Sequence, residues 1–273
     1  MCAMASRAAV LGKPVAHSLS PVIHNAGYAA AGLTHWRYTA VECAEAELVD
    51  LVARLGPEWA GLSLTMPLKE VALTVADQVA PVAAALGAAN TLVPRSDGWY
   101  AENTDAPGMV DVLRAAGLAT VNHAAVLGAG GTARAALAAA QHLGARQVSV
   151  YARRPAAVDA LRPVAEHLGL RLVYGDFTDA AGCGRADLVI STVPKGAADG
   201  LGVPWRPETV VFDAVYDPWP TPLAASARSA GCAVASGLDL LLAQAVRQFT
   251  LFTGQSAPVD AMRRALSEAA ARR

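Results

Sequence analysis

The segment Ala124-Ala125-Val126-Leu127-Gly128-Ala129-Gly130-Gly131-Thr132-Ala133 decides the fold of this chain. It reads as an apolar strand, a glycine loop and an alanine-rich helix, which is the context that a dinucleotide-binding loop needs. Gly128 permits a tight turn, Gly130 lets the backbone approach a pyrophosphate, and the helix after Gly131 offers N–H donors to an anion. Ala133 replaces the third glycine of the usual pattern and still allows close helix packing. The alternative is a glycine-rich turn that binds no nucleotide.

The next strand, 147–151, distinguishes between cofactors. An NAD site has an Asp or Glu at the end of this strand for the ribose 2′-hydroxyl, whereas this chain has Ala152-Arg153-Arg154. Two guanidinium groups suit a 2′-phosphate, which predicts NADP. The competing interpretation is a pair of solvated arginines at a helix start. The expected cofactor contacts in this half of the chain are Gly128, Ala129, Gly130, Gly131, Thr132, Ala133, Arg153 and Arg154.

Short apolar strands alternate with helical stretches on both sides of this segment, which predicts an α/β fold with mostly parallel sheets. Before it, strands are expected at 9–11, 36–41 and 61–65, with helices from 21 and over 44–55. The Ser96-Asp97-Gly98 turn predicts a hairpin of 90–93 with 99–101. After it, strands are expected at 170–173, 188–191, 210–213 and 233–235, followed by helices over 238–252 and from 258.

The length of 273 residues suits two domains. We expect a mostly parallel α/β substrate domain formed by 1–105 and 242–273, to which the C-terminal helices return. The second domain, 106–241, is expected to be Rossmann-like and to bind the dinucleotide.

Composition excludes several classes of protein. The net charge of −1 argues against a nucleic-acid partner, and no apolar run is long enough to span a membrane. Cys2, Cys43, Cys183 and Cys232 share no CxxC spacing, so we expect plain thiols, no disulfide framework and no metal site. The first ten residues are too short in apolar content for a secretory leader, which predicts a cytoplasmic location.

Two serines precede the helix that Pro21 is expected to open. Ser18 and Ser20 lie two residues apart at this helix start, which is a natural arrangement for binding a carboxylate. A simple N-cap by Ser20 is the alternative, but it leaves Ser18 unexplained.

A lysine follows a strand in an unusual setting. If Pro67 opens a helix, Lys69 falls in the first turn, where the helix dipole disfavours a cation by roughly 0.3–1 kcal/mol. Either solvent or an anion then stabilises Lys69. Asp105 lies at the junction of the expected domains, although it could merely cap the next helix. A lysine and a carboxylate facing an alcohol carbon and a nicotinamide suffice for hydride transfer coupled to proton transfer.

Several segments together resemble the shikimate dehydrogenase family. They occur in the order of that family and cover nearly the whole chain. They are 12–25 with its His17-Ser18-Leu19-Ser20-Pro21 core, 65–69, 87–91, 103–105, 128–133, 213–216 with 221–223, and 237–245. The chain departs from the family pattern at Ser63-Leu64, at Ala152 with Arg154, and at Leu240, where Asn-Val, Asn with Thr, and Met are usual.

The resemblance implies a reversible, NADP-linked interconversion of 3-dehydroshikimate and shikimate in aromatic amino-acid biosynthesis. It implies a catalytic pair, Lys69 and Asp105. It further implies that Ser18, Ser20 and Tyr216 hold the substrate carboxylate. The resemblance assigns the ring hydroxyls to Thr65, Asn90 and Gln244, and it places Thr192 and Gly237 near the cofactor.

Three alternatives remain open at this point. One is a quinate or quinate/shikimate dehydrogenase that uses NAD, against which the arginine pair argues. Another is a non-catalytic sensor of a shikimate-like ligand, although both catalytic residues are present. The third is a folate-linked dehydrogenase of similar layout, which would not require the Ser-Leu-Ser segment. The expected partner is a small-molecule substrate, and the chain is expected to act as a monomer or homodimer.

Overall fold

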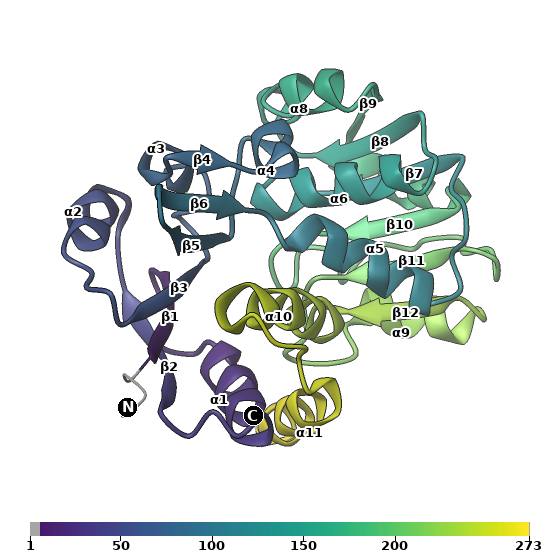
Figure 1. Ribbon diagram of the computed structural model, residues 1–273. Helices are drawn as coiled ribbons and strands as arrows, with labels where there is room; N and C mark the ends of the chain where they lie inside the picture. The colour runs from purple at the N-terminus through teal and green to yellow at the C-terminus, as the bar shows by residue number, and fades with distance from the viewer. Residues whose placement is uncertain (1–5, 273) are drawn as a thin grey trace. The chain divides into compact units, whose positions relative to one another are not determined.

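A computed structural model describes residues 6–272 of the chain, shown in Figure 1. The chain divides into two compact units. Unit 1 comprises Met1–Thr104 and Leu241–Arg273, and unit 2 comprises Asp105–Leu240. Both units combine helices with a sheet, so the predicted α/β fold class is confirmed. Cys2 lies outside the described residues, whereas the other three cysteines are buried free thiols, as expected.

The sheet of unit 2 has the strand order of a doubly wound dinucleotide-binding fold. Its strands lie in the order β12-β11-β10-β7-β8-β9, and every neighbouring pair is parallel. The strands are β7 (His123–Leu127), β8 (Gln147–Ala152), β9 (Arg171–Asp176), β10 (Leu188–Ser191), β11 (Val210–Asp213) and β12 (Ala233–Ser236). The chain order reverses between β7 and β10, which is where such sheets bind ligands.

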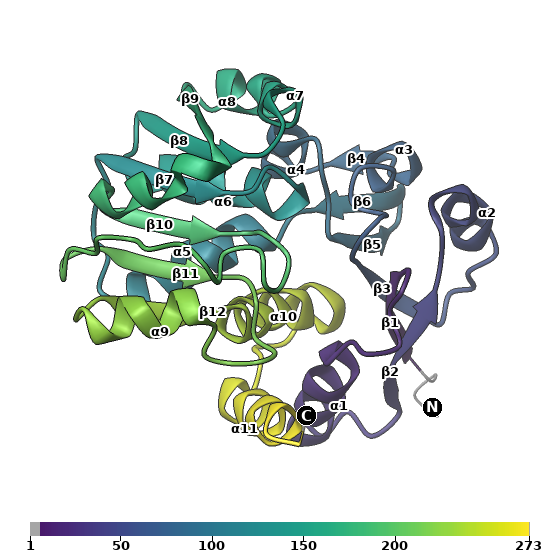
Figure 2. The ribbon, with the colours of Figure 1, turned by 180° about the vertical axis from the view of Figure 1, so that it is seen from behind.

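Helices cover both faces of this sheet. On one face α5 (Asp105–Ala115) and α6 (Gly131–His142) lie side by side, as Figures 1 and 2 show. On the other face the 3-10 segment η2 (Phe177–Arg185) and α9 (Pro222–Ser229) pack on the strands. Two short helices, α7 (Pro155–Asp159) and α8 (Arg162–His167), complete the β8–β9 connection.

The sheet of unit 1 is mixed. Its order is β2-β1-β3-β5-β6-β4, in which β1 pairs in parallel with β2 and β3, and β5 pairs antiparallel with β3 and β6. The strands are β1 (Ser6–Gly12), β2 (Trp36–Glu42), β3 (Trp59–Leu64), β4 (Gln78–Val79), β5 (Thr91–Arg95) and β6 (Gly98–Glu102). The predicted hairpin is therefore confirmed. The edge strand β4 was not predicted, because two residues are too few for a periodic pattern.

Unit 1 has a helical layer on each face of its sheet. One layer contains η1 (Glu45–Glu47), α2 (Leu48–Ala53), α3 (Ala72–Val75) and α4 (Pro81–Leu86). The other contains α1 (Ser20–Ala30), α10 (Gly237–Thr253) and α11 (Val259–Ala270), with α1 packed beside α11. The C-terminal helices therefore return to the first unit.

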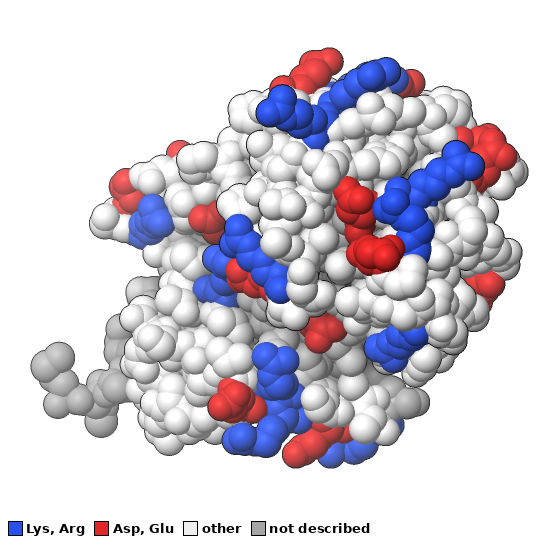
Figure 3. Space-filling view, turned by 90° about the vertical axis from the view of Figure 1, so that its right-hand side faces the viewer, with Lys and Arg blue, Asp and Glu red and all other residues white. Residues whose placement is uncertain are grey.

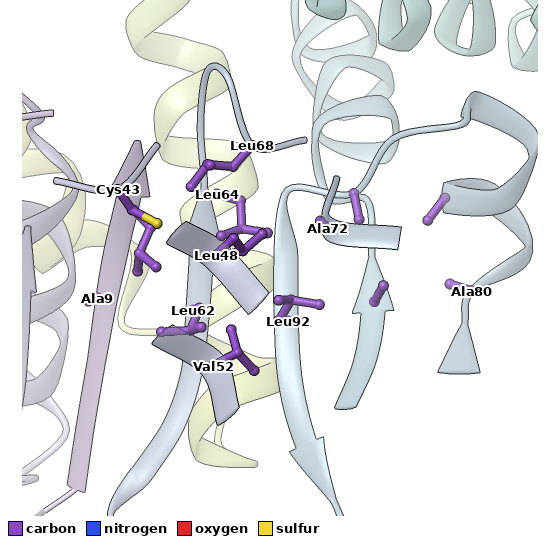
Figure 4. Packing of buried hydrophobic residues seen from close by; sticks show 14 residues of the cluster. Ala9, Cys43, Leu48, Val52, Leu62, Leu64, Leu68, Ala72, Ala80 and Leu92 are labelled. Atoms are coloured by element: carbon purple, nitrogen blue, oxygen red, sulfur yellow. The ribbon is translucent and has the colours of Figure 1, made fainter. Parts of the chain in front are cut away.

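Strand β3 shows how the sequence separates the two layers. Leu62 and Leu64 point toward α2, where they pack with Leu48 and Val52 in the core that Figure 4 shows. The alternate positions on β3 carry small residues, Gly61 and Ser63, on the side of α10. Because side chains alternate across a strand, one face of β3 is apolar and the other accepts a closely packed helix. Leu68 belongs to the same core and is fully buried, which anchors the turn after β3.

Charged side chains of both signs are interspersed on the face shown in Figure 3, and neither sign forms a continuous patch there. Within residues 6–272, no helix combines the length and the apolar character needed to cross a membrane. The same residues contain no cluster of three His, Cys, Asp or Glu side chains arranged to hold a metal ion.

Gly61 gives a test of the packing between β3 and α10. A Cβ atom at this position would lie 2.1 Å from Cδ1 of Phe252, inside van der Waals contact. We expect Gly61→Ala to lower the free energy of unfolding by about 1–3 kcal/mol, because the buried ring must move. Urea unfolding followed by circular dichroism measures this change. Gly202→Ala is the matched control, since a Cβ atom there meets nothing within 4 Å; equal losses in both variants would contradict the packing described.

Candidate active site

The predicted cofactor residues of unit 2 follow the carboxyl ends of its strands. Gly128 comes directly after β7 and Thr192 directly after β10, the two strands at the reversal of chain order. Gly128 has a φ of +96°, and a Cβ atom there would lie 2.7 Å from Oγ1 of Thr192. The Thr192 hydroxyl donates to the carbonyl of Leu127 at 2.9 Å. Only glycine therefore fits at 128, and Thr192 holds the loop against the sheet.

Gly130 and Gly131 are not required by the packing of the protein around them. A Cβ atom at Gly130 or Gly131 would meet nothing within 4 Å, and both residues are exposed at the N-terminus of α6. This first turn has no side-chain cap and no acidic residue. The backbone N–H groups and the helix dipole can therefore receive an anion that approaches closely, which fits a dinucleotide pyrophosphate. Ala129 and Thr132 flank the loop half-buried, and Ala133 is fully buried as expected.

Arg153 and Arg154 follow β8 at the same edge of the sheet, and both are exposed. Arg154 occupies the N-cap position of α7, without a side-chain cap. Within the described part of the chain, neither guanidinium forms an ion pair. No carboxylate stands at the end of β8 to receive a ribose 2′-hydroxyl. The donor set at this position therefore fits the 2′-phosphate of NADP.

Tyr216 and Gly237 follow β11 and β12. A Cβ atom at Gly237 would lie 2.0 Å from the carbonyl oxygen of Ala214 and 3.1 Å from Cδ1 of Tyr216. Gly237 is therefore required by the backbone around it, whatever else it contacts. The loop that carries Tyr216 is held by Asp213, whose carboxylate accepts from the Thr221 hydroxyl at 2.7 Å and from the Val215 N–H at 3.2 Å. Burial raises the pKa of Asp213.

In unit 1, Ser18 and Ser20 lie in the loop after β1 and at the start of α1. The Ser18 hydroxyl accepts from the N–H of Ser20 at 3.2 Å. Ser20 is buried and is the first residue of α1, while Leu19 occupies the N-cap position without a side-chain bond. The simple cap by Ser20 is therefore wrong. Ser18, which precedes the N-cap, accepts from the N–H of the first helical residue, and this bond accounts for its spacing from Ser20.

The segment after β3 corrects one expectation. Pro67 does not open a helix: Met66–Val71 form turns, the Met66–Pro67 peptide is cis, and α3 begins at Ala72. The carbonyl of Lys69 accepts from the N–H of Ala89 at 2.8 Å, and the N–H of Leu73, four residues on, donates to the carbonyl of Glu70 at 3.2 Å instead. Lys69 is half-buried in this turn, and the helix-dipole argument for its position does not hold.

This turn lies against the loop after β1 and against the segment before β5. The N–H of Lys13 donates to the carbonyl of Met66 at 3.0 Å, and the N–H of Leu64 donates to the carbonyl of Asn90 at 2.8 Å. Thr65 is half-buried there, and its N–H donates to the carbonyl of Leu11 at 2.9 Å. Ser18, Ser20, Thr65, Lys69 and Asn90 therefore come from segments that meet at one edge of the sheet of unit 1.

Asn90 is almost fully buried and held by several hydrogen bonds. Its Oδ1 accepts from the Thr91 hydroxyl at 2.9 Å and from the Thr104 N–H at 2.8 Å. Its Nδ2 donates to Oγ1 of Thr104 at 2.9 Å. Asp105, the next residue after Thr104, is buried and is the first residue of α5 in unit 2. Asp105 therefore lies within the helix that it was expected to precede.

Two glutamines one turn apart on α10 lie in unit 1. Gln244 is buried, and its Nε2 donates to the carbonyl of Leu241 at 2.8 Å. Gln248 was not among the predicted site residues, yet its Nε2 donates to Oγ1 of Thr91 at 2.9 Å and to the carbonyl of Asn90 at 3.2 Å. Residues four apart share a helix face, so Gln244 points to the same side as Gln248. Two glutamines at this spacing in an apolar helix were the signal that sequence reasoning overlooked.

Comparisons with known proteins identify relatives across the chain. Residues 10–92 match the shikimate dehydrogenase substrate binding domain, and residues 237–266 match the shikimate 5'-dehydrogenase C-terminal domain. Shikimate dehydrogenase (NADP(+)) of Moorella thermoacetica is 39% identical over 96% of this chain and 92% of its own.

Solved structures agree with these matches. Shikimate dehydrogenase of Mycobacterium tuberculosis has a TM-score of 0.86 and 43% identity, covering 96% of this chain and 99% of its own. The Thermus thermophilus enzyme, solved in complex with NADP(H) and shikimate, has a TM-score of 0.82 and 33% identity, covering 97% of this chain and 99% of its own.

His24 gives a prediction about pH. Its ring is fully buried in α1 and stacks on Tyr38, with centroids 4.1 Å apart and planes 3° from parallel. Burial lowers the pKa of His24 from 6.5 to about 3. The folded chain then keeps His24 neutral while the unfolded chain binds a proton. Stability therefore decreases as the pH falls from 6.5 toward about 3, by up to about 1.4 kcal/mol per pH unit.

His24→Phe keeps an aromatic ring on Tyr38 and removes the titration. We expect its free energy of unfolding, measured with urea at several pH values, to fall less steeply over this range than that of the unaltered chain. His35→Phe, at an exposed position, is the control and should keep the original slope. An unchanged slope in His24→Phe would show that His24 does not contribute.

Proposed function

The chain belongs to the shikimate dehydrogenase family, and we propose that it is an NADP-dependent oxidoreductase that reversibly reduces 3-dehydroshikimate to shikimate. This reaction belongs to the biosynthesis of aromatic amino acids. The observation that carries the proposal is the set of residues at the reversal point of the unit 2 sheet. Gly130 and Gly131 leave open space at a helix N-terminus, and Arg153 and Arg154 stand at the end of the next strand.

We assign cofactor binding to unit 2 and most of substrate binding to unit 1, with Tyr216 and Asp105 supplied by unit 2. Gly128, Ala129, Gly130, Gly131, Thr132 and Ala133 would hold the pyrophosphate, Arg153 and Arg154 the 2′-phosphate, and Thr192 and Gly237 the remainder of NADP. The match of residues 10–92 to a substrate binding domain supports the assignment of unit 1.

The substrate residues have chemistry that suits shikimate. Ser18 and Ser20, with Tyr216, offer donors to its carboxylate, because serine and tyrosine hydroxyls and a helix start favour an anion. Thr65, Asn90 and Gln244 carry groups that donate and accept, which suits ring hydroxyls. The hydrogen bonds that join the segments of Thr65, Lys69 and Asn90 support this set.

Lys69 and Asp105 are the proposed catalytic pair. NADPH, when bound, supplies the hydride to the carbonyl carbon. Lys69 polarises the carbonyl oxygen and gives it a proton, which leaves the product as an alcohol. Asp105 orients the ammonium group of Lys69 and balances its charge. In the reverse direction Lys69 accepts the hydroxyl proton as the ketone forms.

The remaining assignments concern the setting of the enzyme. The buried free thiols Cys43, Cys183 and Cys232 suit a reducing compartment, so we infer a cytoplasmic location. The net charge of −1 gives no electrostatic reason for a nucleic-acid partner. We assign a small-molecule substrate as the partner and action as a monomer or homodimer.

Initial rates with both substrates and both cofactors test the proposed function. Purified protein is mixed with shikimate or quinate and with NADP or NAD, and the absorbance of the reduced cofactor is followed. We expect the highest kcat/KM with shikimate and NADP. A preference for quinate with NAD would instead identify a quinate dehydrogenase, and no reduction in any combination would leave a ligand sensor.

Lys69→Ala tests the catalytic pair. We expect kcat to fall by about 10²–10⁴-fold, the usual contribution of general acid–base catalysis. The affinity for shikimate, measured by calorimetry, should change far less. Lys13→Ala removes another lysine from unit 1, at an exposed position, and should keep the original rate. Near-normal turnover in Lys69→Ala would exclude the proposed role.

The double variant Arg153→Ala with Arg154→Ala tests the choice of cofactor. We expect the KM for NADP to rise at least about tenfold, since hydrogen bonds to charged groups contribute about 1.5–3 kcal/mol. The KM for NAD should change little, because NAD has no 2′-phosphate. Arg263→Ala with Arg264→Ala, two exposed positions on α11, is the matched control. Equal effects on both cofactors would contradict the assignment.

A further inference from the structure

Gln248 connects three segments of unit 1 through one buried amide. Its Oε1 accepts from the Ser63 hydroxyl of β3 at 2.7 Å, and the Ser63 hydroxyl oxygen accepts from the Tyr38 hydroxyl of β2 at 2.6 Å. Its Nε2 donates to Thr91 at the start of β5. Gln248 is 1% exposed, so water does not compete for these groups. The amide therefore has its partners within the protein.

Tyr38, Ser63, Gln248, Thr91 and Asn90 form a hydrogen-bond relay, in which each side chain donates to the next. The Tyr38 hydroxyl donates to Ser63, so the Ser63 hydroxyl gives its own proton to Oε1 of Gln248. The Asn90 carbonyl can only accept, so it fixes the orientation of the Gln248 amide: Nε2 faces Asn90 and Thr91, and Oε1 faces Ser63. Thr91 then receives a hydrogen bond and directs its single proton to Oδ1 of Asn90 at 2.9 Å.

Asn90 is the last residue of this hydrogen-bond relay. Its Oδ1 receives the Thr91 proton and also the Thr104 N–H, so the oxygen and nitrogen of its amide cannot exchange places without losing both donors. In this orientation the Nδ2 group, which also donates to Oγ1 of Thr104 at 2.9 Å, is the donor that Asn90 presents. A reversed amide would present an acceptor in place of this donor.

We propose that Gln248 is a positioning residue for shikimate: acting through Thr91, it fixes the amide orientation of Asn90, so that Asn90 donates to a ring hydroxyl. This inference rests on the proposed function, in which Asn90 binds the substrate. Gln248 itself contacts Ser63, Thr91 and the Asn90 carbonyl and need not touch the ligand. The effect of losing it is therefore confined to shikimate and does not extend to the cofactor.

Steady-state kinetics of variants in the hydrogen-bond relay test this role. Gln248→Met keeps the length of the side chain and removes both polar groups, and Thr91→Val removes only the hydroxyl. We expect each to raise the KM for shikimate about tenfold, the effect of one disrupted buried hydrogen bond, with kcat within about threefold. The KM for NADP should not change. Thr91→Ser restores the hydroxyl and should restore the KM.

A double variant separates positioning from general damage. Gln248→Met combined with Thr91→Val should raise the KM for shikimate no more than either substitution alone, since both interrupt the same hydrogen-bond relay. Gln255→Met, at an exposed position, is the matched control and should have the original KM. Thermal unfolding identifies a variant that fails to fold. If Gln248→Met fails to fold, the KM values for shikimate of Thr91→Val and Thr91→Ser are compared instead.

The inference is overturned if the folded variants keep the original KM for shikimate, if NADP and shikimate are affected equally, or if Thr91→Ser behaves like Thr91→Val. In each of these cases the unaltered protein still oxidises shikimate, and the proposed function stands. An unaltered protein without shikimate turnover overturns the proposed function, and the inference with it.

Discussion

The buried amide of Asn90 is the constraint on which the candidate site of unit 1 depends. A buried amide without partners costs several kcal/mol, so its hydrogen bonds must form together with the fold. Asn90 meets this requirement by joining the start of β5 to Thr104, the last residue of unit 1 before Asp105. The carbonyl of the same residue receives the N–H of Leu64 from β3. The residue proposed to bind a ring hydroxyl thus also helps to hold the strands together.

The glycines discussed in unit 2 fall into two groups, those that nearby protein atoms require and those with open space around them. Gly128 and Gly237 are required by the protein, through a positive φ and close contacts at one and the approach of the Ala214 carbonyl at the other. Gly130 and Gly131 have open space above them, so packing does not require glycine at either position. A ligand that comes within contact distance of the backbone does require it. This difference, invisible in the sequence, separates the glycines that the fold requires from those proposed to contact the cofactor.

The sequence was informative where a pattern repeats and less so where a single contact decides. The strand that leads to Gly128 and the alternation of strands and helices predicted the sheet of unit 2, because period and loop chemistry are local. The prediction that Pro67 opens a helix was wrong, because contacts with distant segments hold this turn. One of them is the hydrogen bond from the Ala89 N–H to the Lys69 carbonyl. Gln248 was missed for the same reason: its partners on β3 and β5 lie more than 150 residues away.

The most direct measurement of the central claim follows one hydrogen atom. Shikimate carrying deuterium on the carbon whose hydroxyl becomes the ketone is oxidised with NADP, and the reduced cofactor is analysed by mass spectrometry. Hydride transfer predicts one deuterium on the nicotinamide ring of each NADPH formed, with none lost to water. Appearance of the label in solvent, with unlabelled NADPH, would contradict the reaction proposed for this chain.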